Sequence, residues 1–187
     1  MKKIGIVGGT FDPIHIGHIL LGEWAYEQYS LDEVWFMPAG MPYFKKDKKV
    51  TPAKERLENV RAAVSSFSYM KVCDLEVMRE GRTYTYETVE ELNRLYPDNR
   101  FCFIFGEDCL DTLETWREPG RILAGCEIIA ATRGSASDPE KMKEKASALC
   151  EKLGGVIHIM EFPALDISST MIRERIAKGL SVKYLVP

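Results

Sequence analysis

The sequence lacks several features that would assign it to whole classes of proteins. Its 187 residues include only three histidines, and its five cysteines form no CxxC pair, which argues against a cysteine metal site and suits a reduced cytosol. No secretory h-region precedes the first apolar run, and no apolar run approaches the ~20 residues that cross a bilayer. We therefore expect a cytoplasmic protein without a membrane partner.

An excess of positive charge is also missing. With 25 basic and 28 acidic side chains, the formal net charge is -3, which provides no general attraction toward nucleic acid. We expect no nucleic-acid partner, and any polyanion must be bound by a local site. The length and the 45% hydrophobic content suit one well-packed domain over residues 1–187.

Short β-branched or aromatic runs alternate with longer amphipathic stretches, which is the pattern of βαβ units. The near-continuous apolarity of the runs indicates helices on both faces of a parallel sheet, so we expect a Rossmann-like, doubly wound α/β fold. The expected strands are Ile4–Val7, Val34–Met37, Met70–Cys73, Phe101–Phe105, Ile128–Ala131 and Val156–Ile159. The expected helices include 57–67, Glu87–Leu95 and Pro139–Leu153, the last with Asp138 as N-cap and Gly154 at its end.

The stretch GGTFDPIHIGH contains two of the three histidines and follows the first expected strand directly. It lies at the carboxyl end of a parallel strand, where open α/β sheets bind ligands. Gly8 and Gly9 allow a phosphate to approach the backbone, and the following helix start favours anions. His15 and His18 can both face that anion, and beside phosphates their protonated form would be favoured. His158, in contrast, lies within an expected strand and is predicted to have no catalytic role.

This stretch and the segment ISSTMIR at 167–173 together resemble the nucleotidylyltransferase superfamily, which carries an HxGH motif and a late ISSTxIR-like motif. HIGH also occurs in class I aminoacyl-tRNA synthetases, but their further modules do not fit into 187 residues and no KMSKS element is present. The sequence resembles the bacterial nicotinate-nucleotide adenylyltransferases in particular. The matching segments occur in that family's order: GGTFDPIHIGH, LDEVWFMPAG, TPAKERLENV, GRTYTYETVEEL, FIFGEDCLDTLETW, ISSTMIRERI and SVKYLVP.

The resemblance implies transfer of AMP from ATP to nicotinate mononucleotide, which gives nicotinate adenine dinucleotide and pyrophosphate in NAD biosynthesis. The attacking 5′-phosphate is already an anion near neutral pH, so the site must align the reactants and neutralise charge rather than supply a general base. Magnesium is implied as cofactor, held mainly by the ATP phosphates and water, and we name no protein ligand for it. We expect self-association, because dimers and larger assemblies occur in the family.

The resemblance also implies an ATP site built from both motifs. His15 and His18 would contact the phosphates, with His18 nearest the transferred one, and Arg173 would hold the β and γ phosphates. The implied ATP-binding residues are Gly8, Gly9, Thr10, Phe11, His15, His18, Gly106, Asp108, Ile167, Ser168, Ser169, Thr170 and Arg173. Independently of the family, Ser168 or Ser169 is a good N-cap for the last helix.

For the mononucleotide, the resemblance implies that Trp116 stacks on the pyridine ring and that backbone N–H groups at Thr85 meet the nicotinate carboxylate. Lys45 would contact the mononucleotide phosphate and count among the catalytic residues, and Arg133 would reach the phosphates or adenine. Without the family, core packing is the favoured interpretation of Trp116, and a solvated basic loop is the ordinary explanation of Lys45. Thr85 is then equally well interpreted as an N-cap alone.

Two departures from the family pattern stand out. The family usually has Pro-x-His-Lys where this sequence has Pro42-Tyr-Phe-Lys45, so Phe44 replaces a polar group beside the substrate phosphate. The family also continues past its YLVP segment with another helix, whereas this sequence ends at Pro187, so we expect a truncated chain or a piece of a longer polypeptide.

Two other functions remain open at this point. One is an adenylyltransferase for nicotinamide mononucleotide or another phosphorylated acceptor such as phosphopantetheine. The other is a non-catalytic nucleotide-binding module, against which the intact His15, His18 and Arg173 argue.

Overall fold

The computed structural model describes residues 1–41, 50–134 and 137–187 of the chain. In these ranges six strands form one sheet in the order β3-β2-β1-β4-β5-β6, and every neighbouring pair is parallel. The strands are β1 Lys3–Gly9, β2 Glu33–Pro38, β3 Met70–Val72, β4 Arg100–Gly106, β5 Glu127–Ala131 and β6 Ile157–Met160. All six expected strands are confirmed, and the order reverses between β1 and β4 as a Rossmann-like, doubly wound sheet requires.

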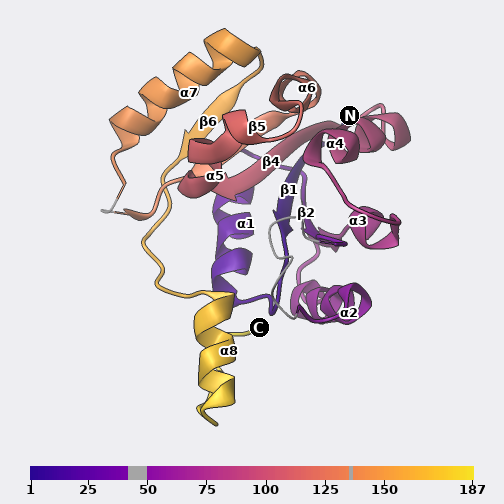
Figure 1. Cartoon of the computed structure of the whole chain (residues 1–187), viewed down its shortest axis with the longest axis vertical. Coiled ribbons are helices and arrows are strands. Elements are labelled where there is room, and N and C mark those ends of the chain that lie inside the picture. Colours follow the sequence, from indigo (N-terminus) through magenta and orange to yellow (C-terminus); the bar gives the residue numbers. More distant parts are fainter. Residues whose placement is uncertain (42–49, 135–136) are drawn as a thin grey trace.

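The described helices connect these strands (Figure 1). They are α1 Ile16–Gln28, α2 Ala53–Val64, α3 Leu75–Met78, α4 Thr85–Leu95, α5 Glu107–Thr112, the 3-10 helix η1 Leu113–Thr115, α6 Pro119–Gly125, α7 Pro139–Leu153 and α8 Ser169–Ala177. The expected ends of α7 are confirmed, because the Asp138 carboxylate accepts a hydrogen bond from the Lys141 N–H and Gly154 ends the helix with a φ of 78°.

Helices cover both faces of the sheet, as expected from the apolar strands. Alternate residues of β4 belong to two separate apolar clusters: Phe101 and Phe103 pack with α4, α6 and α7, whereas Cys102 and Ile104 pack with α1 and α2. No helix within the described ranges combines the length and the apolarity that crossing a bilayer requires.

The fold places the two sequence motifs at one end of the sheet. β1 ends at Gly9 and leads directly into the start of α1, and α8 stands out from the body beside that start (Figure 1). The backbone N–H of Ile16 donates to the Leu185 carbonyl at 2.9 Å, so the last residues of the chain lie against the same helix start. This end of β1 is next to β4, where the strand order reverses and ligands bind in open α/β sheets.

Candidate active site

His15 and His18 lie against each other at the start of α1. Their rings stack with centroids 3.6 Å apart and planes 25° apart, and His15 is 7% exposed. Gly17 leaves room for this arrangement, because a Cβ there would approach the Nδ1 of His15 to 3.1 Å. The two imidazoles predicted from the sequence therefore form one pair rather than two independent groups.

A backbone hydrogen bond selects the tautomer of His18. The N–H of His15 donates to the Nδ1 of His18 at 3.2 Å, so this nitrogen has no proton when the ring is neutral. The proton then resides on Nε2 and can be donated to a ligand. The ring of Phe11 packs edge-on against His18 with centroids 4.9 Å apart, which restricts the orientation of the imidazole.

Burial lowers the pKa of His15 to about 4 and that of His18 to about 3, and the neighbouring His15 adds to the lowering at His18. Both rings are therefore neutral at neutral pH in the protein alone. The expectation of protonated imidazoles accordingly applies only when anionic phosphates lie beside the rings, where their charge raises the pKa. Among the described residues, the buried Nδ1 of His15 has no hydrogen-bond partner.

The start of α8 is hydrogen-bonded to the turn at 10–15, which connects β1 with α1. Ser168 is the N-cap, and its Oγ accepts a hydrogen bond from the Met171 N–H at 3.2 Å, which confirms that one of the two serines caps the helix. Ser169 instead donates its hydroxyl to the Pro13 carbonyl at 2.8 Å, across 156 positions of sequence. The HxGH and ISSTxIR segments are thus joined directly.

Arg173 makes a second link between the two motifs. Its Nη1 donates to the Asp12 carbonyl at 2.5 Å and its Nη2 donates to the Thr170 Oγ1 at 3.1 Å. These bonds hold the guanidinium on the side of α8 that faces the turn before α1. A cation, helix N–H groups and an imidazole donor therefore lie close together, as binding of a polyphosphate requires.

A cavity of about 660 Å³ lies between the start of α1, the ends of β4 and β5, and the segment that leads to α8. Six predicted site residues line it, namely His15, His18, Gly106, Arg133, Ile167 and Ser168. Sequence reasoning missed the stretch 162–166 before Ile167, which lines the same cavity and whose only sequence signal is its position before the ISST motif. The space that a Cβ of Gly106 would occupy has no protein atom within 4 Å, so the protein itself leaves that position open to a ligand.

The other predicted ATP residues are not among those that line the cavity, namely Gly8, Gly9, Thr10, Phe11, Asp108, Ser169, Thr170 and Arg173. The side chain of Phe11 is 1% exposed and packs against His18, so it contributes to the site by supporting this imidazole. Asp108 forms an exposed ion pair with Arg133, which brings together two residues that were predicted separately.

His158 lies in β6 with its Nε2 2.9 Å from Glu127. It lines neither this cavity nor the second cavity described below.

A second cavity, of about 300 Å³, lies at the start of α4. Its lining residues are Thr83, Tyr84, Thr85, Thr115, Trp116, Arg117 and Ile122. The structure therefore brings together Thr85 and Trp116, the two residues that the resemblance assigned to the pyridine ring. Sequence reasoning missed Arg117, whose only signal is its position next to Trp116.

Neither Thr85 nor Trp116 is fully described by its interpretation without the family, which was an N-cap for Thr85 and a core residue for Trp116. Thr85 is the first residue of α4 and not its N-cap; Tyr84 is the N-cap, and no side chain among the described residues caps the first N–H groups of the helix. Trp116 packs on Phe105 with centroids 5.8 Å apart and donates its Nε1–H to the Thr112 Oγ1 at 3.3 Å. It is thus partly a core residue and partly a wall of the cavity.

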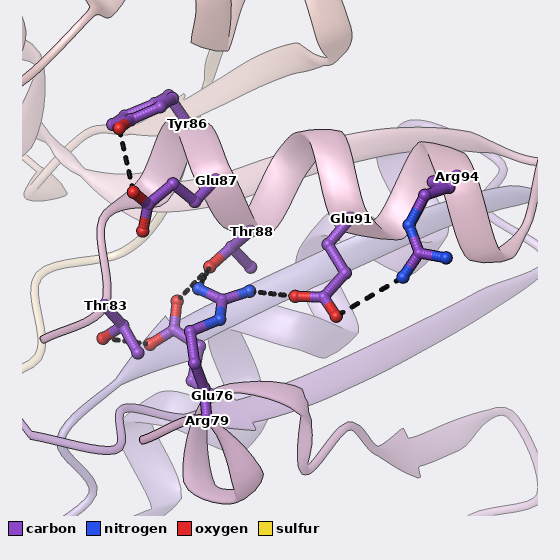
Figure 2. Close-up of polar contacts among 8 residues, drawn as sticks. All are labelled: Glu76, Arg79, Thr83, Tyr86, Glu87, Thr88, Glu91 and Arg94. Atoms are coloured by element: carbon purple, nitrogen blue, oxygen red, sulfur yellow. Dashed lines mark hydrogen bonds and ion pairs between the residues drawn. The ribbon is translucent and has the colours of Figure 1, made fainter. Parts of the chain in front are cut away.

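A polar network that the sequence did not reveal holds the start of α4 in place (Figure 2). Glu76 accepts hydrogen bonds from the hydroxyls of Thr83 at 3.2 Å and Thr88 at 2.9 Å. Arg79 donates to the same Thr88 hydroxyl at 3.0 Å and pairs with Glu91. Burial raises the pKa of Glu76, against the effect of these hydrogen bonds. The network fixes Thr83, and with it one wall of the second cavity.

One predicted site residue lies in a part of the chain that the structure does not describe. Lys45, together with Phe44, lies outside the described residues, so its contact with a mononucleotide phosphate stays a prediction.

Known proteins resemble this chain over most of its length. A model of the family described as cytidylyltransferase-like matches residues 6–175. The chain is 40% identical over 187 residues to the probable nicotinate-nucleotide adenylyltransferase of Lachnoclostridium phytofermentans, covering 100% of this chain and 93% of that protein. It is 42% identical over 185 residues to the protein of the same name from Exiguobacterium sibiricum, covering 99% of this chain and 92% of that protein.

Solved structures share the fold. The Plasmodium falciparum nicotinic acid mononucleotide adenylyltransferase complexed with NaAD superposes with a TM-score of 0.77 at 23% identity, covering 97% of this chain and 87% of that one. The same enzyme complexed with APC gives a TM-score of 0.77 at 22% identity, covering 100% of this chain and 90% of that one.

Proposed function

Because the chain belongs to the nicotinate-nucleotide adenylyltransferases of the cytidylyltransferase-like family, we propose that its two cavities bind ATP and nicotinate mononucleotide for transfer of AMP. The enzyme is a nucleotidyltransferase of NAD biosynthesis, and its products are nicotinate adenine dinucleotide and pyrophosphate. The observation that carries the proposal is the position of β4. Its end supplies Gly106 to the larger cavity, and the chain then continues through α5 to Trp116 in the smaller one.

The larger cavity suits the triphosphate. Neutral His18 offers its Nε2–H, Arg173 supplies a fixed positive charge, and the start of α8 adds N–H groups. These donors stabilise the charge that develops on the leaving pyrophosphate, and each is worth ~3 kcal/mol of barrier in comparable sites. The acceptor phosphate is already ionised, so neither histidine has to remove a proton from it.

The smaller cavity suits the pyridine ring. Trp116 presents an aromatic face to a flat heterocycle, and the uncapped start of α4 at Thr85 presents N–H groups to a carboxylate. Lys45 contacts the mononucleotide phosphate and Arg133 the ATP side of the site in this proposal. Binding in the two cavities would have to align the attacking oxygen with the α-phosphorus, which is the main catalytic requirement.

Magnesium is the cofactor in this proposal. In the described ranges, no group of three or more His, Cys, Asp or Glu side chains could hold a metal ion. The ATP phosphates and water would hold Mg²⁺, in keeping with its strong retention of water ligands, and the ion would neutralise charge on the pyrophosphate.

Pyrophosphate release tests the proposal. The protein is incubated with ATP and Mg²⁺, and with nicotinate mononucleotide, nicotinamide mononucleotide, phosphopantetheine or no acceptor. Release with nicotinate mononucleotide is expected, and a His18→Ala variant prepared in the same way shows that the activity belongs to this chain. Release with another acceptor alone would reassign the substrate, and no release with any acceptor would favour a nucleotide-binding module.

A further inference from the structure

The smaller cavity is called the acceptor cavity below, because the proposed function puts the mononucleotide there. Arg117 is the one cationic side chain among the described residues that line it. It lies there with the wall formed by Thr83–Thr85 and with Trp116. Its guanidinium carbon is 4.7 Å from the centroid of the Tyr84 ring, a cation–π contact. Tyr84 is the N-cap of α4, and it lines the cavity together with Arg117 and Thr85, so the positive charge and the start of the helix belong to the same cavity.

The charge of Arg117 is not neutralised by an ion pair within the part of the chain that the structure describes. The acids in the first two turns of α4 form their hydrogen bonds and ion pairs with groups other than Arg117, although the charge of Glu87 acts on Arg117; Glu91 pairs with Arg79. Glu87 accepts a hydrogen bond from the Tyr86 hydroxyl at 2.8 Å (Figure 2), and Glu90 accepts two from Arg121, each at 2.8 Å. A hydrogen bond with the Tyr84 side chain and, more weakly, the charge of Glu87 raise the pKa of Arg117. Because no ion pair among the described residues neutralises it, the guanidinium can still attract an anionic ligand.

Apart from Arg117, the described residues that line the cavity carry no charge. Thr83, Thr85 and Thr115 contribute hydroxyls, and no acid is among these described residues. A carboxylate on the pyridine ring would be attracted both by the guanidinium and by the positive end of α4. A carboxamide in the same place has no net charge and would have to orient its NH2 group away from both.

We propose that Arg117 makes the acceptor site selective for a pyridine ring that carries a carboxylate over one that carries a carboxamide. This inference rests on the proposed function, since it names the residue that distinguishes nicotinate mononucleotide from nicotinamide mononucleotide. Arg117 is a specificity residue here: it acts on the ring substituent and not on the reacting phosphates.

Arg121 provides a matched control. Its guanidinium also lies over a tyrosine of α4, 4.5 Å from the Tyr86 centroid. It is, however, paired with Glu90 and does not line the cavity. Arg121→Gln therefore removes a stacked arginine from the same surface without changing the charge of the acceptor cavity.

The test compares kcat/KM for the two mononucleotides in the wild type and in Arg117→Gln, Arg117→Lys and Arg121→Gln. In Arg117→Gln, kcat/KM for nicotinate mononucleotide should fall about tenfold, mostly because KM rises. This is the low end of the effect of losing a hydrogen bond from a charged group, as expected for an exposed residue. The value for nicotinamide mononucleotide should stay the same or rise. Arg117→Lys should keep most of the preference, and Arg121→Gln should keep all of it.

The ratio of kcat/KM for nicotinate mononucleotide to kcat/KM for nicotinamide mononucleotide distinguishes a specificity role of Arg117 from a structural role. Equal losses with both substrates, or no change with either, would overturn the role of Arg117. If turnover of the amide is too slow to measure, the same ratio is obtained from dissociation constants measured by calorimetry. A wild type that releases no pyrophosphate with nicotinate mononucleotide would overturn the proposed function instead, and that result does not depend on any Arg117 variant.

Discussion

Arg56 on α2 should make a large contribution to stability, because its guanidinium binds backbone groups from three separate segments. The side chain is 1% exposed. It donates to the carbonyls of Thr51 at 2.9 Å, Thr10 at 2.5 Å, Ala39 at 2.7 Å and Gly40 at 2.9 Å. It thereby joins the start of α2 to the turn after β1 and to the turn after β2.

Arg56→Met retains much of the apolar stem and leaves four carbonyls without this donor. A hydrogen bond from a charged group contributes ~1.5–3 kcal/mol, but the contributions of one side chain are not additive and the variant also recovers the cost of burying a cation. We therefore expect the free energy of unfolding to fall by about 3–5 kcal/mol, because a buried carbonyl left without a donor costs ~1–3 kcal/mol and the recovered desolvation of the cation offsets part of the sum. That is a large part of the ~5–15 kcal/mol that stabilises a typical domain.

Urea unfolding followed by circular dichroism measures this loss. Arg61→Met is the control, because Arg61 lies on the same helix, is exposed, and pairs only with the exposed acids Glu58 and Asp74 among the described residues. The control should lose less than about 1 kcal/mol. If Arg56→Met lost no more than Arg61→Met, the four bonds would not have the role that their burial indicates.

Three further outcomes are expected. His18→Ala should lower kcat by about 10²–10³-fold with little change in the KM for ATP, because its donor acts on charge that develops during transfer; equal losses in kcat and ATP affinity would limit it to binding. As the pH falls from 6.5 to 4, the free energy of unfolding should fall by up to ~1.4 kcal/mol per pH unit for each histidine. In this range the unfolded chain takes up protons on His15 and His18, whereas the folded chain, with pKa values of about 4 and about 3 for these residues, does not. Urea unfolding of a His15→Gln/His18→Gln variant should show a flatter pH profile. Thr83→Val removes a hydrogen bond of ~1 kcal/mol to Glu76 and should raise the KM for the mononucleotide about fivefold while the KM for ATP stays constant, as initial rates would show.

The sequence predicted those parts of the fold that depend on local pattern. All six strands were found because a parallel strand covered on both faces is apolar at nearly every position. The ends of α7 were found because Asp138 and Gly154 are the residue types that capping and a positive φ require. The two motifs were expected to lie together because they match one family, and the Ser169–Pro13 bond shows their contact.

The remainder could not be predicted because it depends on contacts between distant segments. Arg56 lies in an amphipathic helix, where an arginine is normally exposed, and its burial follows from carbonyls at Thr10, Ala39 and Gly40. Glu76 similarly appears as an ordinary acid in a charged stretch, but two threonine hydroxyls bind it in the folded chain. The low pKa values of the histidines follow from burial, which the HxGH spacing does not specify.

One series of contacts connects these unpredicted groups across the site. Arg56 binds the carbonyls of Thr10, in the first motif, and of Gly40. Gly40 packs so closely on the backbone of Glu76 that a Cβ there would overlap the Glu76 carbonyl oxygen, and Glu76 in turn binds Thr83 in the acceptor cavity. In-line transfer requires the two substrates to be held at a fixed separation, and an error of about 1 Å can cost ~100-fold in rate. Since a buried guanidinium and a backbone contact resist displacement more than an exposed ion pair does, we expect these groups to fix that separation, whereas the proposed function assigns the chemistry to the histidines and Arg173.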